Sequence, residues 1–528
     1  MSSTVERGPS AEVGPSVEAT PRPGHPVGKL SALVLLALAS ERVLALALIA
    51  LLAALFGASV QSDAYFFALI VPTAIGTALG EGTYTALLQR VERSPERPIS
   101  ATARVALPSI LGVAVVYVAV LLAVRPGHEA VWLAFSPVIV TLAFGSAFAA
   151  FLTVERRYSL AVLRVPLGTG LALAVVAVVL PFWDSVTAFA ASMMVGYVAS
   201  LAIFLALGRR EPRGGRTGRL ARNVTPVAVM AAAAPVAVAT LVGGQFIIVV
   251  ERSLAAGLAV GAVTLISLAR GIALIPVQFA QALGNGVLPA AAEHYRNLEH
   301  AAVARLNLLA LRLTMVTALV SATFLVICRR ELVRIALQHG ELNAGDAETT
   351  AKLAAILAVS LAGLSAGTVA TKALYALGRQ RFVAVVTAAG VIAYVCLAVV
   401  LRGLGGTTGL AWAFTSSALA TGVLLTVWLA RSSRLDARTV LRDWVVSPAL
   451  LTVAFAAAGY AGWALASRDD GSVAAAVAAV AACGVAGLVA LLAAAALFHQ
   501  PEYELLRRLV RRLRGRLSVG RAAAESAP

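Results

Sequence analysis

From Leu30 onward the sequence repeats one pattern, in which apolar runs of about 20 residues alternate with short polar segments rich in arginine. A helix of that length, with a rise of about 1.5 Å per residue, crosses a hydrocarbon layer of about 30 Å. Charged residues make up 13% of the chain, against about 25% in soluble proteins, and the mean hydropathy is +0.87. The pattern excludes a water-soluble fold and predicts an all-α integral membrane protein.

We predict about fourteen transmembrane helices, because that many apolar runs are long enough to span the bilayer. Their centres lie near Ala45, Ile75, Val115, Thr141, Ala172, Val195, Val238, Leu274, Val316, Leu361, Val391, Ala418, Phe455 and Gly487. The spans near Leu274 and Leu361 are the least uniform, since they carry Arg270 and Lys372.

Basic residues gather in alternate loops, and lysine and arginine are retained on the cytoplasmic side of a membrane. The largest clusters are Arg90–Arg104, Arg209–Arg222 and Arg431–Arg442, and the loops between them are short or balanced in charge. We therefore predict a multi-pass protein of the inner (plasma) membrane with both termini in the cytoplasm. The net charge of +17 follows from these loops and predicts no nucleic-acid partner.

Two segments resemble each other at a distance of 204 residues, measured between Pro72 and Pro276. Ala68–Gly82 and Ala273–Gly286 both contain Ala-Leu-Ile followed by proline, and then Ala-Leu-Gly-x-Gly. Because the two segments belong to the second and eighth predicted spans, an offset of six, the repeat is parallel and predicts two six-helix lobes plus two C-terminal helices, as in alternating-access transporters. The alternative is chance recurrence in a chain rich in alanine and leucine. We expect Pro72 and Pro276 to bend their helices during gating.

The repeat, the loops and the composition give a predicted domain organisation. It comprises a disordered, proline-rich cytoplasmic tail (1–28), an N-terminal six-helix lobe (29–207), a basic cytoplasmic linker (208–225), a C-terminal six-helix lobe (226–430), two extra transmembrane helices (431–498) and a basic amphipathic cytoplasmic tail (499–528).

Ionisable residues inside the apolar runs are the strongest candidates for function, because each costs a few kcal/mol in the bilayer. Arg42 lies about 20 Å beyond Lys29 along its helix, and Arg270 is similarly deep. Two guanidinium groups in a cavity would favour an anionic substrate that carries phosphate. Arg164, Arg312 and Lys372 lie closer to the cytoplasmic ends, where we expect them to reach the headgroups.

Acidic residues offer a different interpretation of the same positions. Glu41 adjoins Arg42, and Glu81 or Glu251 could approach it from neighbouring helices and neutralise it without any ligand. The helix of Arg270 has no acid within a turn. Asp63 stands at the outer start of its helix, where an N-cap role would explain it without a substrate.

The sequence offers little for catalysis. Cys328, Cys396 and Cys483 lie in or beside apolar runs, too far from histidine or from one another in sequence for a metal motif. No phosphate-binding loop ending in Gly-Lys-Ser/Thr occurs, and no segment outside the spans is long enough for an ATPase domain. We predict no catalytic residue, no metal and no cofactor, and expect energy from a gradient or the membrane potential.

Several short segments between about residue 30 and residue 430 have a characteristic order and spacing. They are Glu41–Leu44, Leu55–Ala58, Ser62–Phe66, Pro72, Glu81–Gly82, Leu268–Arg270, Ile275–Pro276, Val287–Pro289, Glu331–Gly340 and Ala373–Leu377. Together they resemble the MurJ (MviN) family of lipid II flippases, whose first two helices read Ser-Arg-x-Leu-Gly-x-x-Arg-Asp, Phe-Gly, Asp-Ala-Phe, Pro-Asn and Glu-Gly.

The resemblance implies the multidrug/oligosaccharidyl-lipid/polysaccharide exporter fold and export of a lipid-linked peptidoglycan precursor from the inner to the outer leaflet. By position, Arg42 matches the family's first cavity arginine, Asp63 its acid and Arg270 the arginine of the eighth helix. The implied partners are a lipid-linked anionic glycan and the bilayer. A coupling cation stays open as a further partner.

The sequence departs from the family pattern at charged positions. The family's second first-helix arginine and the acid after it fall on Leu48 and Ile49, its basic pair after Pro-Asn on Gly76 and Thr77, and the acid before the eighth-helix arginine on Ala269. With fewer positive charges, the cavity would bind a diphosphate differently or carry another lipid-linked glycan. Restoring arginine at Leu48 or Gly76 is expected to strengthen diphosphate binding.

Two further functions remain open. A cation-coupled multidrug or polysaccharide exporter on the same fold would use cavity carboxylates, for which Glu41, Glu81 and Glu251 are candidates in gating or coupling. A membrane-embedded glycan polymerase or ligase would need catalytic residues in an outer loop, and the only sizeable one is 329–352.

Overall fold

The computed structural model describes residues 27–88, 91–94, 106–124, 127–154, 157–182, 185–208, 217–220, 226–467 and 472–497. The predicted N-terminal tail up to residue 26, the predicted C-terminal tail, and residues 209–216 and 221–225 of the predicted linker lie outside the described residues. So do several of the arginine-rich loop segments from which we predicted the orientation.

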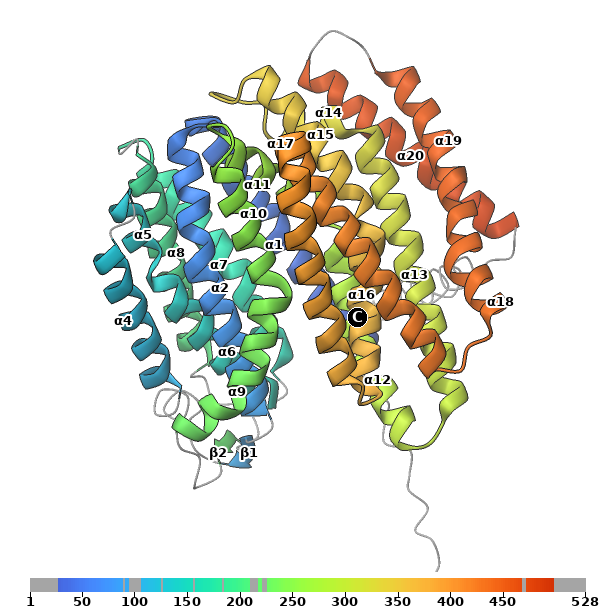
Figure 1. Cartoon of the computed structure of the whole chain (residues 1–528), viewed down its shortest axis with the longest axis horizontal. Helices are drawn as coiled ribbons and strands as arrows, with labels where there is room; N and C mark the ends of the chain where they lie inside the picture. The colour runs from blue at the N-terminus through green and yellow to red at the C-terminus, as the bar shows by residue number, and fades with distance from the viewer. Residues whose placement is uncertain are drawn as a thin grey trace, which may run out of the picture.

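The chain forms helices because a backbone in hydrocarbon must satisfy its polar groups within its own segment. The first helix group consists of α1 (Val27–Phe56), α2 (Val60–Leu88), α4 (Leu107–Val124), α5 (Glu129–Phe135), α6 (Pro137–Val154), α7 (Tyr158–Val179) and α8 (Val186–Gly208). Figure 1 shows α4, α5 and α8 at one edge of the molecule.

The second helix group continues to residue 432. It consists of α9 (Pro226–Thr240), the π-helical turn η1 (Leu241–Gln245), α10 (Phe246–Ala256), α11 (Ala262–Ala273), α12 (Val277–Arg296), α13 (His300–Ile327), α14 (Arg329–Ala336), α15 (Ala344–Val359), α16 (Leu361–Ala376) and α17 (Gln380–Ser432). The chain then adds α18 (Ala437–Val440), the π-helical turn η2 (Leu441–Val446), α19 (Ser447–Ala466) and α20 (Val473–Leu497), with α19 and α20 at the opposite edge from α4 (Figure 1).

The predicted helical membrane fold is confirmed. Among the described residues, eleven helices are long and apolar enough to cross a membrane, or thirteen if two bent helix pairs each count as one span. One helix, α17, has 53 residues and a non-helical Gly406, and it contains the predicted spans near Val391 and Ala418. The exact number of fourteen is not confirmed by this count.

A short two-stranded ribbon adds to the helices. Strand β1 (Val91–Ser94) pairs antiparallel with β2 (Thr217–Leu220), so the loop after α2 is hydrogen-bonded to the segment after α8. The ribbon marks the end of the molecule that we call the lower end, and the turn from α1 into α2 marks the upper end (Figure 1).

The buried apolar residues join the two helix groups at the upper end. The largest hydrophobic cluster includes Leu52 of α1, Phe66 of α2, Ile266 of α11 and Leu357 of α15. Because burial of apolar surface is the main favourable term in packing, this shared cluster holds the groups together there.

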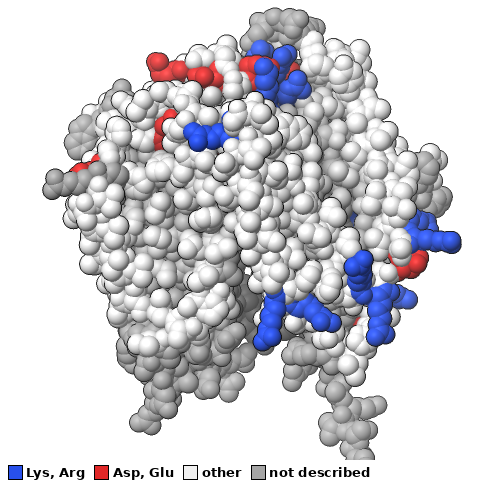
Figure 2. Space-filling model, viewed as in Figure 1, with Lys and Arg blue, Asp and Glu red and all other residues white. Residues whose placement is uncertain are grey.

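At the lower end the clusters are separate. One contains Ala291, Leu311 and Leu374 from the second group, and another contains Leu87 and Phe151 with part of α9. Figure 2 shows a recess that opens at the lower edge between the groups, with basic side chains beside it. The two groups therefore share one large cluster at the upper end, whereas at the lower end they meet where α9 packs on α2 and the rest of the second group forms its own cluster.

Candidate functional site

Arg270 lies in the last turn of α11 and is held by Glu251 of α10. Its Nε donates to Glu251 Oε2 at 3.1 Å, and its Nη2 donates to both carboxylate oxygens at 2.6 Å. The guanidinium also stacks on the ring of Phe414 of α17, with 4.1 Å from Cζ to the ring centroid. The Arg270 side chain is 13% exposed and that of Glu251 only 1%. The pair is thus a buried, forked ion pair covered by an aromatic face.

This pairing differs from what we predicted. The helix of Arg270 indeed supplies no acid, but the neighbouring α10 does, so Arg270 is neutralised in this conformation. The prediction that Glu251 could approach Arg42 is wrong here, because Glu251 binds Arg270 instead. Two antiparallel helices bring together residues 19 positions apart, which no spacing motif within one helix could indicate.

Two buried hydroxyl groups lie near the pair without hydrogen-bond partners among the described residues. They belong to Tyr394 of α17 and to Ser267, one turn before Arg270 on α11. The ring of Tyr394 contacts Phe414 edge-on, with 6.3 Å between the centroids. Since most buried polar atoms in native structures are hydrogen-bonded, these two hydroxyls are unused donors beside Arg270.

Arg42 has a different environment on α1. Its Nε lies 3.2 Å from Glu41 Oε2, and its side chain is 44% exposed. The carboxamide oxygen of Gln278 on α12, when turned toward Arg42, accepts from Nε at 3.0 Å and from Nη2 at 3.1 Å. The ion pair with Glu41 that we considered is present, but it leaves much of the guanidinium accessible.

The helices that carry the two arginines meet at one seam, where α1 packs against α11 and α12, although the Arg270 side chain itself points to α10 and α17. A Cβ placed on Gly271 would lie 3.5 Å from Ile49 of α1, which brings the residue after Arg270 against that helix. Ile49 is seven residues beyond Arg42, or about 10 Å along the helix. The seam therefore presents an exposed arginine first and a buried, paired arginine farther toward the upper end.

Asp63 joins the two helix groups at the upper end. Its carboxylate accepts from the backbone nitrogen of Gly261 at 2.8 Å, and from the nitrogen and hydroxyl of Thr264 at 2.7 Å each. Gly261 is the N-cap of α11 and has a φ of 85°, so Asp63 caps α11. The N-cap role that we predicted on its own helix is wrong; Ser59 and Ser62 bond to each other's backbone nitrogens at the start of α2.

Further contacts close the upper end. The backbone nitrogen of Glu341 donates to the carbonyl of Ala54 at 2.9 Å. Gly340, with a φ of 65°, approaches the same carbonyl so closely that a Cβ there would lie 2.0 Å from the oxygen. Arg252 of α10 donates to the carbonyl of Phe66 and lies over its ring. The carbonyls of Ala54 and Phe66 thus each accept a hydrogen bond from the other helix group.

The remaining predicted gating residues lie apart from the arginines. Pro72 is inside α2, which is one continuous helix from Val60 to Leu88. Pro276 stands in the break between α11 and α12, whose axes differ by 54°. Glu81 is exposed on α2, and among the described residues no ion pair joins it to Arg42 or Arg270.

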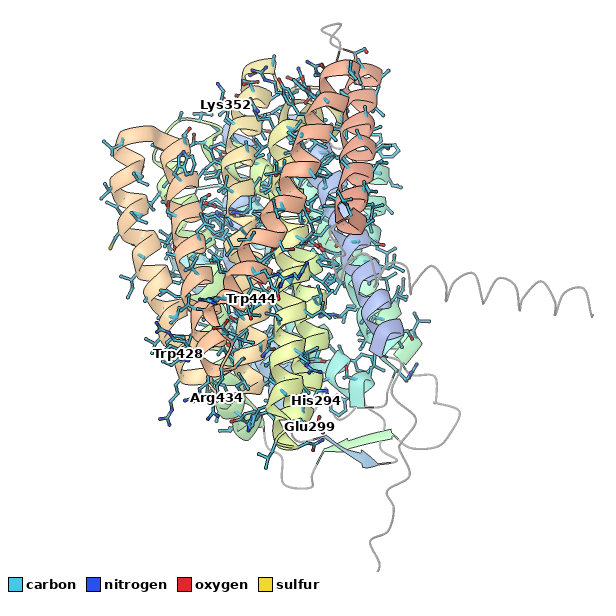
Figure 3. All side chains as sticks on the ribbon, turned by 90° about the vertical axis from the view of Figure 1, so that its right-hand side faces the viewer. His294, Glu299, Lys352, Trp428, Arg434 and Trp444 are labelled. Atoms are coloured by element: carbon cyan, nitrogen blue, oxygen red, sulfur yellow. The ribbon has the colours of Figure 1, made fainter. Side chains whose placement is uncertain are left out.

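Two arginines that we expected at the headgroups turn inward instead. Arg312 is buried and donates to Asp443 Oδ1 at 3.0 Å and to Ser447 Oγ at 2.7 Å. Arg164 donates to the carbonyl of Leu142 at 3.1 Å. Near Arg312, Trp444 donates from Nε1 to the carbonyl of Leu308 at 3.2 Å, which ties η2 to α13 (Figure 3). These hydrogen bonds anchor neighbouring helices to one another.

Three of the five positions where the sequence departs from the family pattern are closely packed. Leu48 is 6% exposed and Ala269 is fully buried in the largest cluster. A Cβ on Gly76 would lie 3.1 Å from both the Cα of Ile139 and the carbonyl oxygen of Val138. Neither Leu48 nor Gly76 faces open space in this conformation, and the effect of arginine at these positions on diphosphate binding stays a prediction.

A comparison of the sequence with models of known protein families identifies the family. The model of the family described as lipid II flippase MurJ matches residues 105–481. The chain belongs to the MurJ lipid II flippase family. The resemblance that we predicted is thus confirmed, and the family is one of lipid transporters. No curated protein matches the sequence.

Solved structures agree with this family in fold. A lipid II flippase MurJ in an inward closed conformation has a TM-score of 0.70 at 15% identity, covering 89% of this chain and 99% of that one. An inward-facing multidrug resistance MATE family transporter of the MOP superfamily has a TM-score of 0.59 at 13% identity, covering 76% and 98%. An outward-facing one reaches 0.57 at 14% identity, covering 77% and 95%.

The side chains that sequence reasoning missed are uncharged or belong to other helices. Phe414, Tyr394, Gln278 and Thr264 all touch or flank the predicted residues, yet each is a common residue within an apolar run. The described residues contain no group of three or more His, Cys, Asp or Glu that could hold a metal ion.

Proposed function

We propose that this protein is a flippase that moves a lipid-linked peptidoglycan precursor, similar to lipid II, from the inner to the outer leaflet of the plasma membrane. The upper end would face outward and the lower end, with both termini, inward. The protein would transport its substrate without changing it chemically. The observation that carries the proposal is the pair of arginines on adjoining helices, one exposed and one buried, in a molecule whose upper end is closed by hydrogen bonds between the two helix groups.

Alternating access accounts for the asymmetry between the two ends. Residues 29–207 and 226–430 would move as two lobes, with the upper junction opening as the lower recess closes. The Asp63 cap on α11 would have to break in each cycle, since it joins the two lobes. The break at Pro276 and the proline at position 72 would supply the bending.

Arg42 is suited to make the first contact with a diphosphate headgroup. It is 44% exposed, and Glu41 occupies only part of its donor set. A guanidinium has five N–H donors, so phosphate oxygens can bind while the neighbouring carboxylate stays in place.

To bind the headgroup, Arg270 would have to release Glu251, its present partner. If a diphosphate joined the site while Glu251 stayed ionised and paired, two anions would compete for one buried cation at high cost. We infer that the headgroup displaces Glu251 and that Glu251 takes up a proton or another cation as it leaves. The charged and titratable groups facing Glu251 are Arg270, Arg252 and Tyr394. The displaced carboxylate would then couple substrate entry to a cation.

Reconstituted vesicles that contain a lipid-linked diphosphate precursor in one leaflet test the function. Wild type should move the precursor to the other leaflet, Arg270→Ala should not, and Arg270→Lys should recover part of the rate because one ammonium cannot make a forked contact. Arg312→Ala is the matched control, since it also removes a buried paired arginine but far from the seam. Normal transport by folded Arg270→Ala protein would reject this site.

A cation-coupled multidrug exporter is the second candidate. The likeness to MATE transporters and the buried Glu251 favour it. The two candidates differ in the charge of the ligand, because a cationic drug would bind Glu251 after Arg270 moved away. Titration of purified protein with a polyprenyl diphosphate and with a cationic dye separates them. Binding of the dye but not of the diphosphate would favour the exporter.

A further inference from the structure

Two cysteines that are far apart in the sequence meet beside the C-terminal helices. Cys328 lies between α13 and α14, and Cys483 lies on α20. Both are fully buried, and their side chains lie next to each other. The third cysteine, Cys396, is exposed on α17. Neither buried thiol belongs to the arginine seam or to the upper junction.

Small residues bring the helices close enough for this contact. A Cβ on Gly484 would lie 3.7 Å from the ring of Phe324, one turn before Cys328. A Cβ on Gly459 of α19 would lie 3.3 Å from Cys483 Sγ, so α19 packs on the same side chain. Helix α14 also packs along α20, as the two lie side by side in Figure 1. Around Cys483, α20 is therefore packed against α19, α14 and the last turn of α13.

We propose that Cys328 and Cys483 are a dithiol pair that closes to a disulfide and so joins α20 covalently to the end of α13. In the reaction, two S–H bonds break and one S–S bond forms. An oxidant of the disulfide class accepts the two electrons and the two protons and is reduced to two thiols. The mixed disulfide formed on one cysteine is resolved by the other, which is already in contact with it.

The environment determines when the bond forms. Burial raises the pKa of the Cys328 thiol, and the neighbouring Cys483 and Glu331 add to the rise. Since the thiolate is the attacking species, the raised pKa makes Cys328 slow to react, and burial restricts the reaction to small oxidants that can reach the two thiols.

The bond would complete the attachment of α19 and α20 to α13. At the lower end this attachment consists of the contacts from Arg312 to Asp443 and Ser447 and from Trp444 to the Leu308 carbonyl. The disulfide would add a second anchor on the same helix near its upper end. Because α13, α19 and α20 would then move together, closing the bond should leave transport unchanged.

A cleavage experiment tests the pair without reference to transport. A protease site is inserted between α19 and α20, and full-length protein in membranes is treated with 4,4′-dipyridyl disulfide, cleaved, denatured and run on a non-reducing gel. The two fragments should stay joined in wild type and in Cys396→Ser, and should separate after reduction. They should separate under all conditions in Cys328→Ser and Cys483→Ser.

Alkylation of the denatured protein gives the second measurement. Because the exposed Cys396 forms a mixed disulfide with the reagent, treated wild type should have no free thiol and carry one thiopyridyl group, measured by intact mass, whereas Cys328→Ser and Cys483→Ser should each carry up to two. Separated fragments, or two free thiols in treated wild type, would overturn the proposal. Joined fragments in Cys483→Ser would also overturn it, since another pairing would then be responsible.

Discussion

Arg270 and Arg42 are the same residue type in two contrasting environments, one buried and one exposed. Arg270 is 13% exposed, makes a forked pair with a fully buried carboxylate and lies on an aromatic ring. Arg42 is 44% exposed, has its acid next to it in sequence and reaches an amide on another helix. The helix that carries Arg270 is also capped at its far end by Asp63.

The difference indicates an order of events. A headgroup that enters from the lower end meets an accessible cation at Arg42 without breaking any buried pair. To reach Arg270 it must replace Glu251, and α11, which holds Arg270, is tied through Asp63 to the upper junction. Charge exchange at one end of α11 and release of the cap at its other end would therefore be connected through 12 residues of helix.

Breaking the buried pair should have the largest effect. Glu251→Ala leaves Arg270 buried without a carboxylate, which typically costs about 3–5 kcal/mol. We expect a large drop in the midpoint of unfolding in detergent, measured by fluorescence or by thermal aggregation. Glu251→Gln keeps an acceptor and should lose less. An unchanged midpoint in Glu251→Ala would mean that Arg270 is neutralised by something other than Glu251.

Removing the cap on α11 should have the next largest effect. Asp63→Ala removes three hydrogen bonds to an ionised acceptor, and a single bond of this class contributes about 1.5–3 kcal/mol. The upper junction should open more often. With native cysteines replaced by serine and a single cysteine at Ala58, labelling by a membrane-impermeant maleimide should become faster than in the Asp63 parent. Asp63→Asn is the control, and equal labelling in all three would show that the cap does not hold the junction.

Removing the exposed arginine should have a small effect on stability and a large one on transport. Arg42→Ala should change the free energy of unfolding by less than about 1 kcal/mol, since partly exposed ion pairs contribute little. Transport in vesicles should nevertheless fall sharply. Glu41→Gln, which frees Arg42 from its neighbour, should transport at least as well as wild type. A strongly destabilised Arg42→Ala would make the residue structural instead.

The smallest change expected is at the exposed end of α14. Arg330 and Glu348 pair at 2.8 Å, and the Arg330 side chain is 63% exposed. Arg330→Ala should shift the unfolding midpoint within measurement error, because such surface pairs contribute about 0–1 kcal/mol. It should also leave transport intact, which makes it a reference for the other arginine variants. Loss of transport in this variant would extend the functional region well beyond the seam.

Much of the fold could be predicted from the sequence, because consecutive residues determine the length and polarity of a membrane helix. The apolar runs, the resemblance around Asp63 and Pro276 and the depth of both arginines required only local information. Apolar runs cannot show which helices pack against each other. The proposed order of events at the seam depends on that packing, so it could not be predicted from the sequence.

The predictions that proved wrong have the same cause, because they depended on contacts between helices that are distant in the sequence. Asp63 binds a backbone nitrogen 198 residues away, and Arg312 finds its acid on a segment beyond α17, so neither partner lies in the local pattern. Gly76 matches a charged position of the family pattern, but in the fold it packs closely against α6, which the sequence does not show. Cys328 and Cys483 are ordinary apolar-run residues until α20 lies against α13.

Binding of a polyprenyl diphosphate to purified Glu251→Gln protein tests most directly whether substrate and Glu251 compete for Arg270. If they do, the variant should bind the diphosphate at least about tenfold more tightly than wild type, which corresponds to about 1.4 kcal/mol. The double variant Glu251→Gln/Arg270→Ala should lose that gain. Equal or weaker binding by folded Glu251→Gln protein would contradict the exchange of partners at Arg270.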